Sequence, residues 1–288
     1  MAPSIYKVKQ DMCDIGKRIW QRGYCAGNEG NHSVRIDKNR VLCTPTGISK
    51  GFLRPEMICM VDMENKVLEA NRGYKPSSEV KIHLQIYKTR DDIGAVVHSH
   101  PPHATAFAVA GIPLPEGIHP EAEVFLGRVP TAQYATPSKQ DLADSLIPHI
   151  KAETSAILMA NHGSVTFDTD LTGAYYRLEI LDAYSRILLL AKQLGKVNML
   201  DSKQMYDLLE VKQQFGFNDP RLSCAADGCI GSTQNQPFLT MFDARPASAV
   251  CDANGTVQSH GGASTSTVSD ESFEQMVQTI TDQIMASR

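Results

Sequence analysis

SSEVKIHLQIYKTRDDIGAVVHSHPPHA, residues 77–104, contains both of the repeating patterns from which the fold is built. Its first half has apolar residues at helical spacing, among them Val80 and Ile86. Its second half contains a β-rich run, Ala95-Val96-Val97, that leads into His98-Ser99-His100. We therefore predict a helix followed by a strand that carries two histidines at its end.

The two histidines of this strand can reach one point in space. Alternate residues of a strand point to the same face, so the imidazoles of His98 and His100 lie on one side. Pro101-Pro102 stops the strand, which leaves both rings at its exposed C-terminal end. A third candidate, His162, follows a similar apolar run, and three histidines leave a tetrahedral zinc ion one open position for catalysis. The alternative interpretation is a pair of hydrogen-bonded histidines near a strand end and a turn histidine bonded to backbone.

The composition is that of a soluble globular protein. The 288 residues, 42% of them hydrophobic, suffice for one large domain or one domain with appendages, and the net charge of −4 gives no sign of nucleic-acid binding. Seven cysteines without a framework spacing favour a reducing compartment and free thiols, and we interpret the Cys224/Cys229 pair as structural rather than as a metal or redox pair. Without a signal-peptide pattern or a membrane-length apolar run, we expect a cytoplasmic protein with no membrane partner.

The order of helices and strands predicts the fold class. We expect helices over residues 8–20, 103–110, 141–147, 171–194 and 205–215, besides the one that begins near residue 78. We expect strands over residues 33–36, 41–43, 57–61, 67–69, 95–100 and 156–160, and prolines that break residues 113–130 into loop and short strands. This mixture favours an α/β fold with a central, mainly antiparallel sheet flanked by helices over regular βαβ alternation.

Small residues in separate segments are typical of anion binding. These segments are Gly30-Asn31, Thr46-Gly47 and Ser77-Ser78, and the last pair lies at a predicted helix start, where free amides favour a phosphate. Turns use the same residue types, so each segment alone is a weak signal. Glu79 at the same helix start is a candidate general base, or alternatively a carboxylate that complements the helix dipole.

Together these motifs resemble the class II aldolase/adducin family over residues 5–217. The resemblance implies an α/β fold with a large central sheet, a homotetramer with active sites at subunit interfaces, and one zinc ion per subunit. It assigns the zinc to His98, His100 and His162 and the acid/base role to Glu79. It assigns the phosphate of a sugar phosphate to five residues: Asn31, Thr46, Gly47, Ser77 and Ser78.

The implied reaction is metal-dependent cleavage of a ketose 1-phosphate, of the fuculose or rhamnulose type, to dihydroxyacetone phosphate and lactaldehyde. The metal ion acts as a Lewis acid, so no lysine Schiff base is required. Two family tyrosines are replaced here by Pro120 and Phe215, and neither residue can donate a proton. His119, Glu121 and Glu123 are candidates for the missing acid/base on the aldehyde side.

Three other functions stay open. A carboxylate such as Glu123 also fits a pentulose-phosphate 4-epimerase, and the same scaffold serves sugar-phosphate dehydratases. A non-catalytic adducin-like module is the third, although such a module is expected to lose metal ligands.

The chain after the resembling region has a different character. We predict a catalytic domain over residues 1–218, an extension and flexible linker over residues 219–268, and an amphipathic helix over residues 269–288. Phe273, Met276, Ile280 and Ile284 form the apolar stripe of that helix, which either docks on the core or binds a partner. It resembles the peptides that direct enzymes into bacterial microcompartments. This resemblance implies a shell protein as partner and a location in the compartment lumen.

Overall fold

The computed structural model describes residues 3–231, 234–243, 250–251 and 257–258. The chain forms two compact units, Met1–Asp243 and Ala244–Arg288. In the second unit, β9 (Val250–Cys251) pairs with β10 (Val257–Gln258) in antiparallel orientation. The helix predicted over residues 269–288 lies outside the described residues.

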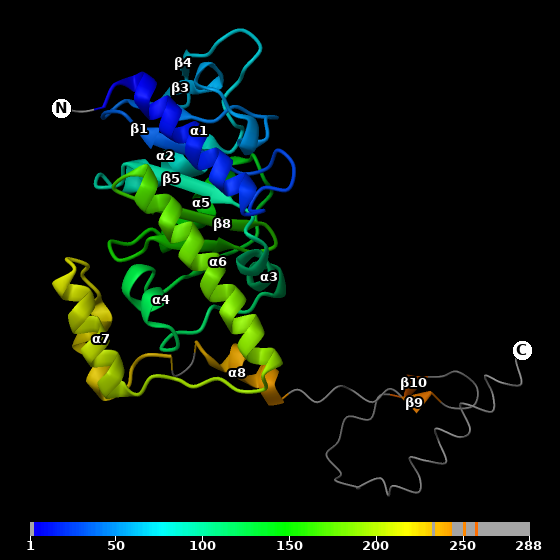
Figure 1. Cartoon of the computed structure of the whole chain (residues 1–288), viewed down its shortest axis with the longest axis vertical. Helices are drawn as coiled ribbons and strands as arrows, with labels where there is room; N and C mark the ends of the chain where they lie inside the picture. The colour runs from blue at the N-terminus through cyan, green and yellow to red at the C-terminus, as the bar shows by residue number, and fades with distance from the viewer. Residues whose placement is uncertain (1–2, 232–233, 244–249, 252–256, 259–288) are drawn as a thin grey trace, which may run out of the picture. The chain divides into compact units, whose positions relative to one another are not determined.

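An eight-stranded sheet forms the centre of the first unit, and its strands follow the order β4-β3-β2-β1-β5-β8-β7-β6 (Figure 1). All neighbouring strands are antiparallel except the short pair β6 and β7, so the predicted mainly antiparallel α/β fold is confirmed. The strands are β1 (Asn31–Arg35), β2 (Arg40–Cys43), β3 (Cys59–Asp62), β4 (Val67–Glu69), β5 (Ala95–Ser99), β6 (Thr131–Ala132), β7 (Ala156–Met159) and β8 (Gly163–Asp168).

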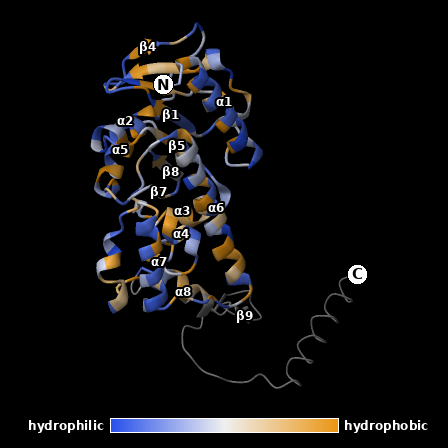
Figure 2. Cartoon of the chain, turned by 60° about the vertical axis from the view of Figure 1, so that its left-hand side comes forward, coloured by the Kyte–Doolittle hydropathy of each residue, from blue (hydrophilic) through white to orange (hydrophobic). Residues whose placement is uncertain are grey.

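Helices cover both faces of this sheet. The α-helices of the first unit are α1 (Ile5–Gln21), α2 (Val80–Thr89), α3 (Pro102–Ala110), α4 (Pro120–Phe125), α5 (Gln140–Leu146), α6 (Leu171–Gln193), α7 (Ser202–Gln214) and α8 (Gln236–Asp243). Short 3-10 helices include η1 (Lys50–Phe52) and η4 (Pro220–Ser223). In Figure 2, α1 and α6 carry both hydrophilic and hydrophobic residues, as expected of helices with one face toward a core.

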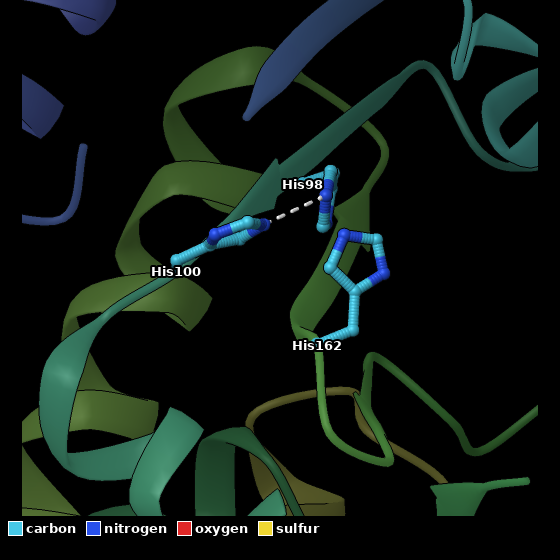
Figure 3. A group of neighbouring side chains, drawn as sticks. All are labelled: His98, His100 and His162. Carbon is cyan, nitrogen blue, oxygen red and sulfur yellow. Dashed lines mark hydrogen bonds between the residues drawn. The ribbon is translucent and has the colours of Figure 1, made fainter. Parts of the chain in front are cut away.

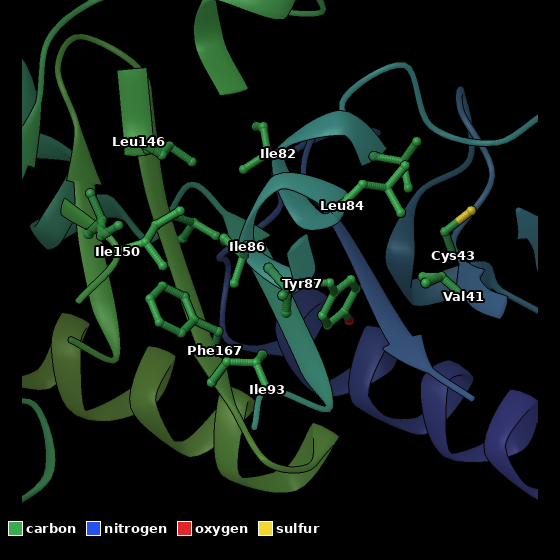
Figure 4. Packing of buried hydrophobic residues seen from close by; sticks show 14 of the residues in the cluster. Val41, Cys43, Ile82, Leu84, Ile86, Tyr87, Ile93, Leu146, Ile150 and Phe167 are labelled. Carbon is green, nitrogen blue, oxygen red and sulfur yellow. The ribbon is translucent and has the colours of Figure 1, made fainter. Parts of the chain in front are cut away.

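The alternation of side chains along β5 decides which helix each residue faces. Val96 packs in the cluster formed with α2 and α5, shown in Figure 4. Ala95 and Val97 pack in the cluster formed with α1 and α6. Since the period of a strand is two, His98 follows Val96 and faces α2, the helix that Glu79 precedes.

The compact unit continues past residue 218. Phe238 of α8 is fully buried in a third cluster with α3 and α6, and its ring lies 6.1 Å from that of Phe107. The buried amide of Asn235 exchanges two 2.7 Å hydrogen bonds with the backbone of Glu116. Residues 234–243, far beyond residue 218, are therefore packed against the sheet domain.

Several elements were not predicted, among them β8, α4 and α8. The sequence pattern of β8 was missed because Ser164 and Thr166, both polar, are fully buried in it, and Thr166 Oγ1 donates to the carbonyl of Ala174. Residues 113–130 were predicted as loop and short strands, but α4 begins at Pro120, a residue that fits the first turn of a helix. The helix α8 was missed because residues 224–242 show little hydrophobic periodicity in the sequence.

The expectation of free thiols is wrong for one pair of cysteines. Cys224 and Cys229 form a disulfide across the turn after η4, with their Cα atoms 5.7 Å apart. Cys13, Cys25, Cys43 and Cys59 are free. None of the helices that the structure describes has the length and apolar character needed to cross a bilayer.

Candidate metal and phosphate site

The three predicted metal ligands come together at one end of the sheet (Figure 3). His98 lies near the end of β5, between β1 and β8, and His100 follows that strand directly. His162 lies in the tight turn from β7 to β8, which Asn161 closes with a left-handed φ of 57°. Gly163 allows the close packing of this turn, since a Cβ there would lie 2.6 Å from Cδ2 of His100.

The spacing of the three rings fits a metal ion. One potential ligand atom from each histidine lies within 4.8 Å of the other two, and Nε2 of His98 is 3.3 Å from Nε2 of His100. Tetrahedral zinc with Zn–N bonds of about 2.0–2.1 Å requires ligand nitrogens separated by about 3.3 Å. The separation of His98 and His100 therefore matches one edge of that tetrahedron.

The hydrogen bonding of the histidines also fits a cation. Nδ1 of His98 lies 2.8 Å from the carbonyl of Ser164 and must donate to it, which leaves a lone pair on Nε2 in the neutral ring. That lone pair faces Nε2 of His100 and, at 3.4 Å, Oε2 of Glu79. Facing acceptors repel each other unless a proton or a metal ion lies between them.

Burial favours the neutral, metal-binding form of these histidines. Burial, then the charges of His98 and His162, lowers the pKa of His100 to about 4. Burial, then the charge of His98, lowers the pKa of His162 to about 4 as well. Both rings are therefore neutral at pH 7, as metal ligands must be.

Glu79 lies beside the histidines at the start of α2. Its Oε1 is 3.6 Å from Nε2 of His162, and its Oε2 accepts a 3.4 Å hydrogen bond from Nδ2 of Asn31. Burial raises the pKa of Glu79, but in acid, where the histidines are protonated, a hydrogen bond from His98 and the charges of the three rings outweigh burial and lower the pKa to about 2. Glu79 is thus an ionised carboxylate within reach of the metal-binding group.

The predicted phosphate residues lie on adjacent loops. Pro45 and Pro76 form an isolated antiparallel β-bridge, and the amide of Ser77 donates a 3.1 Å hydrogen bond to the carbonyl of Thr44. The loop that holds Thr46 and Gly47 is therefore side by side with the loop that holds Ser77 and Ser78. Oγ of Ser77 accepts a 3.3 Å hydrogen bond from the amide of Glu79, which links this loop to the carboxylate.

Asn31 connects the loops to the histidines. It pairs with His98 across β1 and β5 and is 3% exposed. Its Oδ1 is buried without a partner among the described residues. Gly30, with a φ of 73°, is required before it, because a Cβ there would lie 2.9 Å from the carbonyl oxygen of His98.

The candidates for the aldehyde side have other partners. The buried Glu123 accepts a 2.6 Å hydrogen bond from the amide of Gly117 and lies 2.9 Å from a guanidinium nitrogen of Arg221. Glu121 is exposed and its carboxylate is 3.3 Å from Nδ1 of His119. These contacts place Glu123 in a structural ion network and do not bring any of the three residues to the histidines.

Several residues at the site were missed by the sequence reasoning. Oγ of Ser138 lies 2.7 Å from Oγ of Ser78, and nothing in the sequence indicates this pairing. His83, fully buried, bonds Oγ of Ser33 at 2.7 Å. His83 follows Glu79 by four residues, and this spacing could have indicated that the two side chains are neighbours on one helix face. Lys50 is buried between two of the loops, and its sequence context gave no sign of this.

A cavity of about 630 Å³ lies away from this site. Its lining includes Arg90, Arg177 and Phe217, together with Asp168 at the far end of β8 from His162. None of the predicted site residues lines it.

The fold and the histidine group define a mixed α/β protein with a three-histidine site suited to a divalent metal ion. The chain belongs to the class II aldolase and adducin family, because residues 10–189 match the family model described as the class II aldolase and adducin N-terminal domain. The resemblance inferred from the motifs is thereby confirmed.

Individual relatives differ in the reactions that their names state. The chain is 34% identical to an L-fuculose phosphate aldolase of Methanococcus maripaludis, over 62% of this chain and 93% of that protein. It is 35% identical to a 3-oxo-tetronate 4-phosphate decarboxylase of Haemophilus influenzae, over 69% of this chain and 95% of that protein. A solved L-fuculose 1-phosphate aldolase superposes with a TM-score of 0.66 at 32% identity, covering 75% of this chain and 99% of the other.

Proposed function

We propose that this protein is a metal-dependent aldolase that cleaves a ketose 1-phosphate of the fuculose or rhamnulose type to dihydroxyacetone phosphate and lactaldehyde. The observation that carries the proposal is the convergence of three imidazoles with an ionised carboxylate 3.4 Å from one ring and 3.6 Å from another. Relatives named as L-fuculose phosphate aldolases support the choice of substrate class.

His98, His100 and His162 would hold the metal ion, and zinc is the ion that a neutral three-histidine set suits best. A divalent cation bound there would polarise the substrate carbonyl and stabilise negative charge that develops on its oxygen. Glu79 would carry the proton that is exchanged with C3 of the substrate. In the cleavage direction, the C4 hydroxyl gives up its proton to a base on the aldehyde side, the C3–C4 bond breaks to form the aldehyde, and the electron pair stays on C3 of the three-carbon phosphate. A proton relayed from solvent through Glu79 then reaches C3, so one proton leaves O4 and one is gained at C3, and Glu79 is ionised again.

The phosphate end of the substrate would be held by Asn31 and by the loops of Thr46-Gly47 and Ser77-Ser78. Thr46, Gly47 and Ser78 are exposed and Ser77 is at the edge of burial, so their hydroxyls and amides are accessible to a ligand. Fixing the phosphate there places the reacting carbons near Glu79, because Ser77 is hydrogen-bonded to the amide of Glu79.

A second candidate function is decarboxylation of a 3-oxo-tetronate 4-phosphate. Loss of CO₂ from such an acid leaves the same three-carbon phosphate carbanion that the aldol cleavage leaves, so Glu79 would serve both reactions. Pro120 and Phe215 favour this candidate, since a decarboxylation needs no acid/base group on the aldehyde side. The similarity to the Haemophilus influenzae decarboxylase favours it as well.

Two assays on the zinc-loaded protein, one for aldol addition and one for decarboxylation, test the proposal. With dihydroxyacetone phosphate and L-lactaldehyde, we expect a ketose 1-phosphate, detected by ³¹P NMR, whereas a decarboxylase would release CO₂ from 3-oxo-tetronate 4-phosphate. Glu79→Gln is the matched control and should form either product about 10²–10⁴-fold more slowly with bound zinc retained. Zinc-loaded protein that makes neither product would refute the proposal. Epimerised pentulose phosphate or a dehydrated sugar phosphate would point to the other enzymes of this scaffold.

The assembly is proposed on the family resemblance alone. A homotetramer with sites at subunit interfaces could bring His119 or Glu121 of a neighbouring copy to the aldehyde end of the substrate. Docking of residues 269–288 on a microcompartment shell protein stays a prediction. Light scattering would measure the assembly, and co-purification with and without residues 269–288 would test the docking.

A further inference from the structure

Lys50 is a buried lysine at the start of η1. It is 2% exposed, and its Nζ donates to the carbonyls of Asn28 and Ile48, each at 2.7 Å. An ammonium group has three N–H donors, so one of the three has no acceptor among the described residues.

The charge of Lys50 lacks the partner that other buried lysines have. Nζ of Lys9 lies 2.6 Å from a carboxylate oxygen of Glu69, and Nζ of Lys212 lies 2.8 Å from one of Asp219. In the ranges that the structure describes, Lys50 forms no ion pair of this kind. A buried cation without an anion is costly, because two backbone dipoles replace its hydration only in part.

The two carbonyls that bind Lys50 belong to the loops of the predicted phosphate site. Asn28 lies two residues before Gly30-Asn31, and Ile48 directly follows Thr46-Gly47. The buried Lys50 therefore links these two loops through its hydrogen bonds to their carbonyls. Burial has the largest effect and lowers the pKa of Lys50, while Cys25, Glu29 and Glu79 raise it, so the lysine interacts electrostatically with the carboxylate of the site.

The predicted phosphate ligands themselves carry no positive charge. They offer an amide side chain, hydroxyls and backbone N–H groups, whereas a phosphate monoester carries nearly two negative charges at neutral pH. Lys75 is adjacent in sequence to this region, but its side chain is exposed, and water and salt screen an exposed charge. A buried charge is screened much less.

We propose that Lys50 is a specificity-determining residue that supplies the buried counter-charge for a phosphate dianion and fixes the two loops that contact it. The inference rests on the proposed function and deepens it, since it makes a doubly charged phosphoryl group the feature by which a substrate is selected. Binding of the dianion would in turn compensate the unpaired charge of Lys50.

The test compares Lys50→Met with Lys9→Met in the full-length, zinc-loaded protein. Lys9→Met is the matched control because it also removes a buried lysine, but one that has its own carboxylate. Titration calorimetry with inorganic phosphate is expected to show a Kd raised about tenfold or more in Lys50→Met and unchanged in Lys9→Met. The KM for the ketose 1-phosphate should rise by a similar factor, with kcat and zinc content within about twofold of wild type.

The outcomes separate the inference from the proposed function. If Lys50→Met binds inorganic phosphate within about twofold of wild type, the inference is wrong and the aldolase proposal stands. If the wild type neither binds phosphate nor turns over a sugar phosphate, the proposed function itself fails. Should Lys50→Met not fold, Lys50→Gln, which keeps donors for the two carbonyls without the charge, gives the same comparison. A fall in kcat alone would show a structural role and overturn the inference.

Discussion

Gly163→Ala should weaken metal binding without removing any ligand. The added Cβ would lie 2.6 Å from Cδ2 of His100 and 2.8 Å from the carbonyl oxygen of Ser99. Relieving the first contact to an ordinary 3.4 Å requires a movement of 0.8 Å between the turn and the His100 ring. Metal–ligand distances tolerate only about 0.2 Å, so this movement is about four times what the site can absorb.

Two magnitudes follow from this geometry. Overpacking of a buried position costs about 1–3 kcal/mol, which corresponds to a Tm lowered by about 2–4 °C per kcal/mol in a domain of this size. Displacement of one ligand should reduce zinc affinity about 10–100-fold, the usual effect of disturbing the residues that orient a ligand.

Competition with a chromophoric chelator measures the zinc affinity, and calorimetry of the metal-free protein measures the Tm. Ser164→Ala is the control, because it keeps the backbone carbonyl that accepts from Nδ1 of His98 and removes only a hydroxyl from the same strand. It should leave zinc affinity unchanged. Gly163→Ala protein with wild-type zinc affinity and wild-type Tm would show that the His100 ring does not pack on this glycine, and the reasoning would be refuted.

Three further predictions concern charge. Glu79→Gln should lower turnover about 10²–10⁴-fold with zinc content unchanged, measured by steady-state kinetics and metal analysis, and an active variant would exclude Glu79 as the base. Burial lowers the pKa of His32 from 6.5 to about 4, while a hydrogen bond to the Met12 carbonyl partly opposes it. The neutral His32 ring therefore stabilises the fold fully above pH 6.5, and the free energy of unfolding falls by about 3 kcal/mol as the pH drops from 6.5 to 4. A His32→Gln variant whose Tm has the same pH dependence as wild type would contradict this. Arg221→Met should cost about 3–5 kcal/mol, because it leaves the buried carboxylates of Glu116 and Glu123 without this cation, and urea unfolding with an unchanged midpoint would refute it.

Local patterns were enough to predict the histidine group. His98 and His100 are two residues apart on a strand, and the period of a strand alone puts them on one face. Glu79 was singled out as a candidate base from its place at a predicted helix start, and the structure puts it 3.4 Å from His98 and 3.6 Å from His162. The strands from β1 to β5 were found because their apolar residues are frequent, as in Val41-Leu42-Cys43.

Features that depend on tertiary contacts were not predictable in this way. Ser164 and Thr166 are polar in sequence but fully buried in β8, where the strand ladder and Thr166's own bond to Ala174 satisfy them. The burial of Lys50 depends on two carbonyls 22 and 2 residues away, and no local pattern encodes such a contact. The ion pair of Glu123, a candidate acid/base group, with Arg221 could not be predicted either, because Arg221 is remote in sequence.

The register of β1 against β5 has a consequence for how this enzyme family can diversify. Asn31 lies directly opposite His98, so the strand spacing of about 4.8 Å would fix the distance between the proposed phosphate ligand and the proposed metal ligand. A slip of β1 by one residue would turn Asn31 to the opposite face, away from His98, together with the core residues of β1. Under the proposed function, the correct pairing of these two strands therefore sets the length of the phosphorylated arm that a substrate can have, and differences among sugars would be read by residues outside β1 and β5.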